Sequence, residues 1–465
     1  MSAVQEFYDP NTIRMLFTNA MSEMYRKEVP LYQNLLDTVV EVNKEALTNR
    51  DSIADEILDL SRVEGEKHGA IRLGSKNELY NMRRLFAVMG MQPVGYYDLS
   101  IADLPVHSTV FRPVSREDLN KSPFRIFTSL LRLELLPEDI RNSVEEILSR
   151  RQIFTDKCLK LIETHEKQGG LFEAEAQDFI AEALETFRWH NQATVEKDFY
   201  KELLCINSLI ADIVSFKGPH INHLTPRVLD IDLLYARMQE KNIQMTATIQ
   251  GPPKRKIPIL LRQTSFRALS EEISFPNQDG KGIQGTHRAR FGEIETRGAA
   301  LTKDGMELYD KLLNETLSQT KQDDKNYQEI LEKSFSKFPD TVSELFDKNL
   351  VHFNFSINEK ILNQKTATEK DFKEFNLQKL IQEQIIKITP MTYEDFLPVS
   401  AAGIFKSNIV EGGFTKAEAD LQLSNQNDIE TALGVKIINP QTIYQEESQK
   451  SLNQSLEKLG INIQF

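Results

Sequence analysis

Cysteine is scarce in this sequence. Only two of the 465 residues are cysteines, Cys158 and Cys205. Both lie in apolar helical patterns, which favours reduced core residues over a disulfide or a metal-binding pair. The sequence therefore excludes a small fold stabilised by disulfides, and we expect a cytoplasmic protein.

Long hydrophobic runs and basic clusters are also missing. No stretch of about 18 apolar residues is present to span a membrane, and the first residues, MSAVQEFYDPNTIRM, do not resemble a secretion signal. Lysine and arginine together number 56 against 69 acidic residues, which gives a net charge of -13. Since nucleic acids are bound through clustered basic residues, we expect neither a nucleic-acid partner nor a membrane partner. The sequence predicts no oligomeric state.

The common nucleotide and hydrolase motifs are absent as well. We find no Walker, dinucleotide-binding or nucleophile-elbow pattern. A hydrophobic content of 40% and a charged content of 27% are typical of a globular protein. The periodicity predicts an α+β fold with a helical segment at 1–60, a first strand-rich part of the core at 61–115, a helical insertion at 116–217, a βαβββ metal-binding part at 218–310, and helices and strands at 311–465 that complete the core and pocket.

The stretch at 285–310, GTHRARFGEIETRGAALTKDGMELYD, organises the rest of the prediction. We expect one strand that carries His287, Phe291, Glu293 and Glu295 on one face. Gly292 lies inside this strand, where a missing side chain often marks close approach by a ligand or another backbone. Thr302 is expected to cap the helix that follows.

Two carboxylates on an inward strand face require a positive partner nearby. A metal ion could supply this charge, and so could Arg290 and Arg297. If these arginines pair with Glu293 and Glu295, the protein could be a non-catalytic binding or structural protein. The sequence alone leaves this alternative open.

Histidines in other segments favour the metal. His68, His223 and Glu293 stand in three separate stretches, and two imidazoles with one carboxylate form the facial set used by non-haem iron(II). His220 competes with His223 for this role, and Glu295 competes with Glu293. Arg72 lies four residues after His68, so both side chains can point into one cavity, where Arg72 could pair with a substrate carboxylate. A zinc, nickel or manganese enzyme acting as a non-redox lyase or isomerase of the vicinal oxygen chelate type would use similar ligands.

Five sequence strings resemble the 2-oxoadipate dioxygenase/decarboxylase family, also called hydroxyglutarate synthases, a divergent branch of the vicinal oxygen chelate superfamily. They are HGAIR at 68–72, NHLTPRVLDID at 222–232, LLRQTSFRAL at 260–269, ARFGEIETRGAALT at 289–302 and FLPVSAAGIF at 396–405. The chain departs from the family pattern at Arg288, where threonine is usual, and at Thr296, where glutamine is usual. The resemblance implies a curled, vicinal-oxygen-chelate-like β-sheet that encloses the metal site.

The resemblance also implies a reaction and a site. Iron(II) would be held by His68, His223 and a glutamate of the GEIE string, which we assign as Glu293 because it precedes Arg297 by four residues, the spacing in the distantly similar 4-hydroxyphenylpyruvate dioxygenases. Arg72, Val399 and Ser400 would contact the 2-oxoacid. The family converts 2-oxoadipate and O2 to 2-hydroxyglutarate and CO2 in lysine breakdown, with no organic cofactor.

Three further residues are expected to orient the ligands. They are Gln263, His287 and Arg297. For Gln263 and His287, a polar residue satisfied within the core is an equally compatible interpretation.

Overall fold

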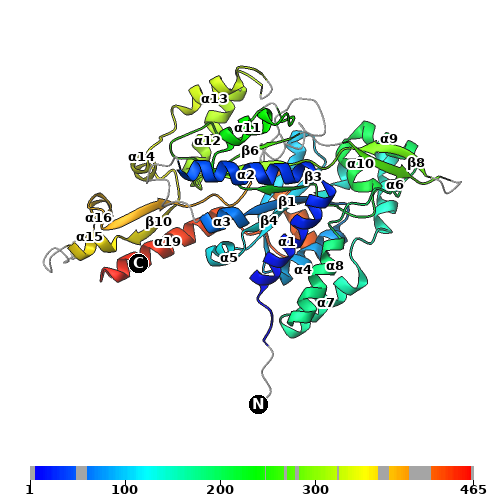
Figure 1. Ribbon diagram of the computed structural model, residues 1–465, viewed down its shortest axis with the longest axis horizontal. Helices are drawn as coiled ribbons and strands as arrows, with labels where there is room; N and C mark the ends of the chain where they lie inside the picture. Colours follow the sequence, from blue (N-terminus) through cyan, green and yellow to red (C-terminus); the bar gives the residue numbers. More distant parts are fainter. Residues whose placement is uncertain are drawn as a thin grey trace, which may run out of the picture.

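A mixed five-stranded sheet lies at the centre of the fold (Figure 1). The structure is a computed structural model that describes residues 6–48, 60–246, 248–266, 270–277, 282–321, 324–364, 376–396 and 420–461. The sheet has the order β2-β3-β4-β1-β5. Its strands are β1 (Lys67–Leu73), β2 (Gln92–Asp98), β3 (Val106–Arg112), β4 (Phe124–Leu131) and β5 (His223–Pro226). β1 and β4 run parallel, and the other neighbouring pairs are antiparallel.

Two further strands continue this sheet beyond β5. Arg227, directly after β5, forms a parallel bridge with Glu295 of β9 (Glu293–Arg297), and the Val228 amide donates to the Glu295 carbonyl at 2.8 Å. β9 pairs in turn with β6 (Leu261–Ser265), antiparallel. The adjacent strands β1, β5 and β9 therefore supply the side chains at 68, 223 and 293.

The remaining strands of the described residues form two antiparallel pairs outside the central sheet. β7 (Glu271–Phe275) pairs with β8 (Ile283–His287), and β10 (Phe353–Ile357) pairs with β11 (Ile386–Pro390). The strands after β5 differ from the expected βαβββ unit: β5 is followed by helix α11 (Ile231–Glu240) and then by four strands, β6 to β9.

Helices cover the sheet and build the periphery (Figure 1). Those before β5 are α1 (Pro10–Glu28), α2 (Leu31–Thr48), α3 (Leu60–Gly65), α4 (Lys76–Val88), α5 (Arg116–Lys121), α6 (Glu138–Ser149), α7 (Asp156–Gln168), α8 (Glu173–Glu185), α9 (Lys197–Ile206) and α10 (Ser208–Ser215). Those after β9 are α12 (Lys303–Leu317), α13 (Tyr327–Phe335), α14 (Val342–Asp347), α15 (Glu359–Gln364), α16 (Leu377–Gln382), α18 (Asp420–Leu433) and α19 (Pro440–Lys458). Two 3-10 turns lie at Leu99–Ala102 and Leu133–Leu135. Among the described helices, none combines the length and the apolarity that a membrane crossing requires.

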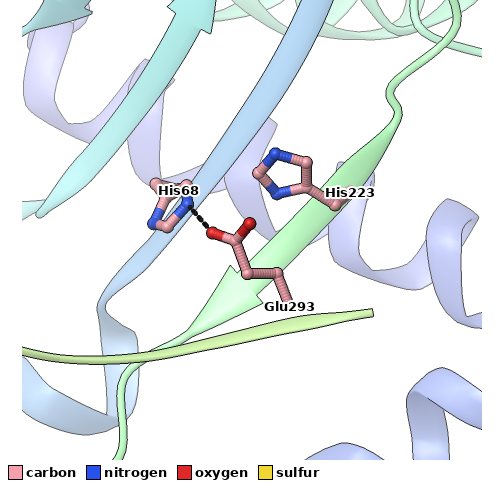
Figure 2. A group of neighbouring side chains, drawn as sticks. All are labelled: His68, His223 and Glu293. Carbon is pink, nitrogen blue, oxygen red and sulfur yellow. Dashed lines mark hydrogen bonds and ion pairs between the residues drawn. The ribbon is translucent and has the colours of Figure 1, made fainter. Parts of the chain in front are cut away.

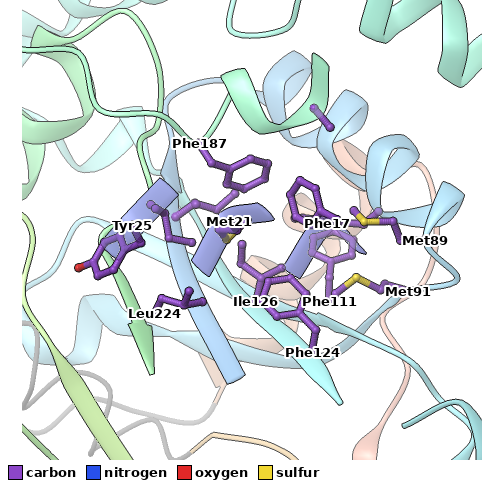
Figure 3. Packing of buried hydrophobic residues seen from close by; sticks show 14 of the residues in the cluster. Phe17, Met21, Tyr25, Met89, Met91, Phe111, Phe124, Ile126, Phe187 and Leu224 are labelled. Carbon is purple, nitrogen blue, oxygen red and sulfur yellow. The ribbon is translucent and has the colours of Figure 1, made fainter. Parts of the chain in front are cut away.

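Helix α1 anchors the apolar core beside β4 and β5. Asp9 caps it and Pro10 occupies its first turn, as the sequence predicts. Phe17 lies edge-on to Phe124 of β4, and the same helix places Met21 and Tyr25 beside the strands (Figure 3). The Tyr25 hydroxyl donates to the Phe291 carbonyl at 2.7 Å, so this helix also holds the chain just before β9.

The predicted helical stretch at 116–217 is not helical throughout. It contains β4, which lies between β3 and β1 and is buried along its whole length. A strand buried on both faces has no polar alternation, so its short apolar run cannot be told from a buried helical segment by periodicity.

The predicted strand from His287 to Glu295 is also wrong, because the chain leaves one sheet and enters another between β8 and β9. Gly292 lies at this crossing, and a Cβ there would sit 1.8 Å from Cε1 of the Phe266 ring. The missing side chain therefore leaves room for the Phe266 ring, whose residue also donates its backbone amide to the Gly292 carbonyl at 2.9 Å.

Two smaller expectations also fail. Alternation at 243–249 predicts a strand, but the described residues there form only isolated bridges, from Met245 and Gln250 to the β6 region. Cys205 is exposed rather than in the core, while Cys158 is buried, and both are free thiols. Cys205 lies near the end of α9, whose buried side chains are Tyr200 and Leu203.

Candidate metal centre

Three donor side chains meet where β1, β5 and β9 lie side by side. His68, His223 and Glu293 bring one ligand atom each to within 4.8 Å of one another, and Figure 2 shows the two imidazoles and the carboxylate turned toward a common point. All three are buried, with exposed fractions of 0%, 3% and 3%. Within the described residues, this is the one group of histidine, cysteine and acidic side chains with metal-binding geometry.

His68 stands between two carboxylates, one at each ring nitrogen. Its Nε2 lies 2.8 Å from Oε1 of Glu293, and its Nδ1 lies 3.1 Å from Oε2 of Glu295. Burial alone would lower the pKa of His68, but Glu295 and Glu293 together raise it above its ordinary value. With Nδ1 directed at Glu295, the Nε2 atom is the one available to a metal on the Glu293 side.

His223 is held as a neutral imidazole. Its Nδ1 hydrogen-bonds the Thr225 hydroxyl at 2.9 Å, and its ring stacks on Phe291 with centroids 5.0 Å apart. Burial lowers the pKa of His223 to about 4. A metal binds the neutral form, and the Thr225 contact leaves Nε2 for it.

The two glutamates of the GEIE string have different partners. Arg297 donates to Glu295 through Nε at 2.7 Å and through Nη2 at 3.0 Å, and this pairing contributes to a pKa of Glu295 well below its usual range, against the effect of burial. Glu293 instead contacts His68 and accepts from the Thr225 hydroxyl at 3.3 Å.

Arg290, the second arginine considered from sequence, does not pair with either glutamate of the string. It binds Glu28 at 2.5 Å and Glu271 at 3.0 Å. Glu295 is thus neutralised by an arginine, whereas in the described part of the chain no arginine bonds Glu293. A cation at the two histidines would provide the missing positive charge.

A buried ionic cluster lies behind Glu295. Glu66 accepts from Arg125 and from Arg227, both at 2.7 Å, and lies 3.6 Å from Arg297. Burial raises the pKa of Glu66, but Arg227 and Arg125 outweigh it and hold the pKa well below its usual range. This cluster fixes Arg297, and through it Glu295, against Nδ1 of His68, the ring nitrogen that faces away from Glu293.

Arg72 belongs to a second polar cluster centred on Asp212 of α10. Its Nη1 donates to Oδ2 of Asp212 at 2.5 Å. His287 and His220 contact the other oxygen, Oδ1, through their Nε2 atoms at 2.9 and 3.3 Å. His220 therefore points at Asp212 rather than at Glu293, which separates it from His223.

His287 lies in this second cluster as well. Its ring nitrogens bond Asp212 and the Tyr200 hydroxyl, so neither is directed at His68, His223 or Glu293. Asp212 is a functional candidate that the sequence motifs do not contain. The signal that could have found it is a lone carboxylate in the otherwise apolar helix SLIADIVS.

Gln263 and Arg297 lie on the Glu295 side. Gln263 faces Glu295 across the β6–β9 pair, is 2% exposed, and its Oε1 atom is buried without a hydrogen bond. Arg297 pairs with Glu295, which lies beside His68. The other predicted substrate contacts, Val399 and Ser400, lie outside the described residues.

The donor set fits a divalent transition metal. Octahedral ligands at about 2.1 Å from an ion stand roughly 3 Å from their neighbours, close to the 2.8 Å between His68 and Glu293. Two imidazoles and one carboxylate leave positions open for other ligands, as in non-haem iron sites. The set contains no thiolate, which a structural zinc site would favour.

Three comparisons with known proteins agree with one another. A family model described as 2-oxoadipate dioxygenase/decarboxylase matches residues 17–408. The chain is 46% identical over 465 residues to the 2-oxoadipate dioxygenase/decarboxylase of Pseudomonas putida, covering 98% of each chain, and 46% identical over 443 residues to that of Escherichia coli, covering 94% and 96%.

A solved structure is similar over the whole chain. The crystal structure of the hydroxyglutarate synthase in complex with 2-oxoadipate from Pseudomonas putida matches with a TM-score of 0.89 and 44% identity. It covers 99% of this chain and 100% of that one.

Proposed function

This chain belongs to the 2-oxoadipate dioxygenase/decarboxylase family, and from that premise we propose that it converts 2-oxoadipate and O2 to 2-hydroxyglutarate and CO2. The family assignment confirms the resemblance carried by the sequence motifs. The reaction balances without another reductant, because the substrate loses CO2 and takes up both oxygen atoms.

The metal in this proposal is iron(II), held by His68, His223 and Glu293. The observation that carries it is the buried Glu293 carboxylate, which lies beside two imidazoles and bonds no arginine in the described part of the chain. When bound, iron(II) supplies the redox centre at which a 2-oxoacid and O2 can both be ligated.

The charge of the site matches an anionic substrate. Two neutral histidines and one glutamate carry a charge of -1, so a divalent ion leaves the group with a net positive charge. Glu295 does not reduce this charge, because Arg297 pairs with it through two hydrogen bonds. An incoming 2-oxoacid is therefore attracted to the ion rather than repelled.

Three residues of the chain would act around the ion. Glu295 holds the ring of His68 so that Nε2 faces the ion, and Thr225 does the same for His223. Arg72, on the same strand face as His68, would bind a carboxylate of the substrate. These contacts fix geometry before the substrate arrives, which is the protein's part in metal catalysis.

The curled sheet of the vicinal oxygen chelate superfamily is the second part of the proposal. Two similar units support it: β1, α4 and β2 to β4 form one, and β5, α11 and β6 to β9 form the other. In each unit the first strand lies parallel to the last, as β1 with β4 and β5 with β9. We also propose a cytoplasmic location, which the two free cysteines support.

Oxygen uptake tests the proposed reaction. The protein is loaded with iron(II) without oxygen, mixed with 2-oxoadipate, and then exposed to a measured amount of O2. We expect one O2 consumed and one CO2 released for each 2-hydroxyglutarate formed. Glu293→Gln should lose the activity, whereas Glu271→Gln, a matched change at the partner of Arg290, should keep it.

One outcome of this experiment would contradict the proposed reaction. If the iron-loaded protein binds 2-oxoadipate but consumes no O2, the dioxygenase proposal is wrong and a non-redox lyase or isomerase takes its place.

A further inference from the structure

The Asp212 carboxylate is the centre of a buried hydrogen-bonded chain that includes Arg72. Asp212 is 4% exposed, and it lies on α10 among apolar neighbours. One of its oxygens accepts from Arg72 at 2.5 Å, and the other faces His287 at 2.9 Å. The carboxylate is thus held from both sides.

The direction of the hydrogen bonds follows from the charges. An ionised carboxylate only accepts, so Nε2 of His287 carries the proton that faces Asp212. In the neutral ring Nδ1 is then an acceptor, and the Tyr200 hydroxyl donates to it at 2.8 Å. The Trp189 ring lies parallel to that of His287 at 6.1 Å, which limits its rotation further.

Arg72 connects this chain to the metal group. It lies four residues after His68 on β1, so the two side chains leave the same face of the strand. The positive charge of Arg72 also lowers the pKa of His223, in addition to the effect of burial. The guanidinium therefore lies on the side of the sheet where the metal ligands meet.

Stability alone is a weak reason for this arrangement. Buried ion pairs contribute little net stability, because desolvation offsets their attraction. An arginine that must meet a carboxylate with two parallel hydrogen bonds gains from having its flexible side chain fixed beforehand. Asp212 supplies such a fixed point for one nitrogen of Arg72.

We propose that Asp212 is a positioning residue for substrate binding: it holds Arg72 toward a carboxylate of the 2-oxoacid, and His287 and Tyr200 hold Asp212. This inference rests on the proposed function, since it names the group that fixes the predicted substrate contact. Asp212 and His287 touch neither the metal nor the substrate in this account.

Binding of 2-oxoadipate to the iron-loaded protein, measured by calorimetry without oxygen, tests this role. Loss of the ionised acceptor that faces Arg72 predicts that Asp212→Asn raises Kd by roughly 10- to 100-fold. Arg72→Ala should weaken binding at least as much. In the Arg72→Ala background, Asp212→Asn should add less than about 2-fold, because it acts through Arg72.

Iron affinity separates positioning from general damage. Asp212→Asn should keep iron affinity within about 3-fold of the parent chain, because Asp212 contacts no ligand of the metal. The matched control is Asp98→Asn. Asp98 is another buried aspartate that faces an arginine, Arg132, and it lies on β2, at the edge of the five-stranded sheet opposite β5. This control should leave Kd for 2-oxoadipate unchanged.

Milder variants keep the test decisive if Asp212→Asn does not fold. Tyr200→Phe removes one hydroxyl and leaves the Asp212–Arg72 pair in place, so it should raise Kd by about 2- to 5-fold, in line with one neutral hydrogen bond. The inference is overturned if Asp212→Asn and Tyr200→Phe leave Kd for 2-oxoadipate unchanged. It is also overturned if Asp212→Asn raises Kd as much in the Arg72→Ala background as in the parent chain. Since binding is measured without turnover, failure of the oxygen chemistry would be seen separately.

Discussion

Replacing Glu295 tests how the chain prepares His68 for a metal. Glu295 lies 3.1 Å from Nδ1 of His68 and is itself held by two hydrogen bonds from Arg297. Loss of such a supporting carboxylate typically weakens metal binding 10- to 100-fold, or about 1.4–2.7 kcal/mol. Glu295→Gln should therefore raise Kd for iron(II) by that factor while leaving Glu293 in place.

Two opposing effects must be separated in this experiment. Glu295 raises the pKa of His68, against the effect of burial, so its removal also reduces competition between protons and the metal. Titration against a chelator without oxygen at a series of rising pH values separates the two effects, because proton competition falls as pH rises and the loss of orientation remains.

A matched variant controls for damage to the buried ionic cluster. Glu394 bonds Arg125 and lies at 2.5 Å from Arg62, in the same cluster but away from His68. Glu394→Gln should lower the free energy of unfolding without changing iron affinity. If Glu295→Gln binds iron as tightly as the parent chain, or if Glu394→Gln weakens iron equally, then Glu295 does not orient His68.

His223→Ala should abolish bound iron and turnover, whereas His220→Gln should retain iron, as measured by metal analysis of anaerobically loaded protein; equal iron in both would contradict the assignment. Gly292→Ala should lower the free energy of unfolding by about 1–3 kcal/mol in urea titrations, because its Cβ would overlap the Phe266 ring; an unchanged midpoint would refute this. Burial raises the pKa of Glu394, but its arginine neighbours lower it from 4.5 to about 2. The contribution of Glu394 to the free energy of unfolding is therefore complete above pH 4.5 and is lost as pH falls toward 2. In Glu394→Gln, the free energy of unfolding should decrease less steeply over that range.

Local signals predicted several elements well. Asp9 and Thr302 cap their helices through side-chain hydrogen bonds, as their position before apolar periodic segments predicts. These features depend on residues close in sequence, where spacing alone determines the contact. His68 and His223 could be predicted as ligands because each lies within a short, continuous family motif.

Contacts between distant segments could not be predicted in the same way. β4 could not be recognised as a strand, because a strand buried on both faces lacks the alternation of apolar and polar residues. Between β8 and β9, the Phe291 carbonyl accepts from the hydroxyl of Tyr25 of α1, which is 266 residues away. Asp212 was missed because its role depends on Arg72, 140 residues earlier. Burial and partner choice at these positions are properties of the assembled fold.

The glutamate assignment shows both kinds of information together. From sequence, Glu293 and Glu295 have the same parity on one strand and similar surroundings. In the fold, Arg297 pairs with Glu295, whereas the Thr225 hydroxyl and Nε2 of His68 contact Glu293. The distinction comes from strand neighbours rather than from spacing.

The central claim is that His68, His223 and Glu293 hold the iron. Crystals grown without oxygen in the presence of iron(II), with diffraction recorded on both sides of the iron absorption edge, would locate the ion directly. We expect one anomalous peak bounded by Nε2 of His68, Nε2 of His223 and the Glu293 carboxylate. A peak at Asp212, His220 and His287 instead, or none at the three predicted ligands, would contradict it.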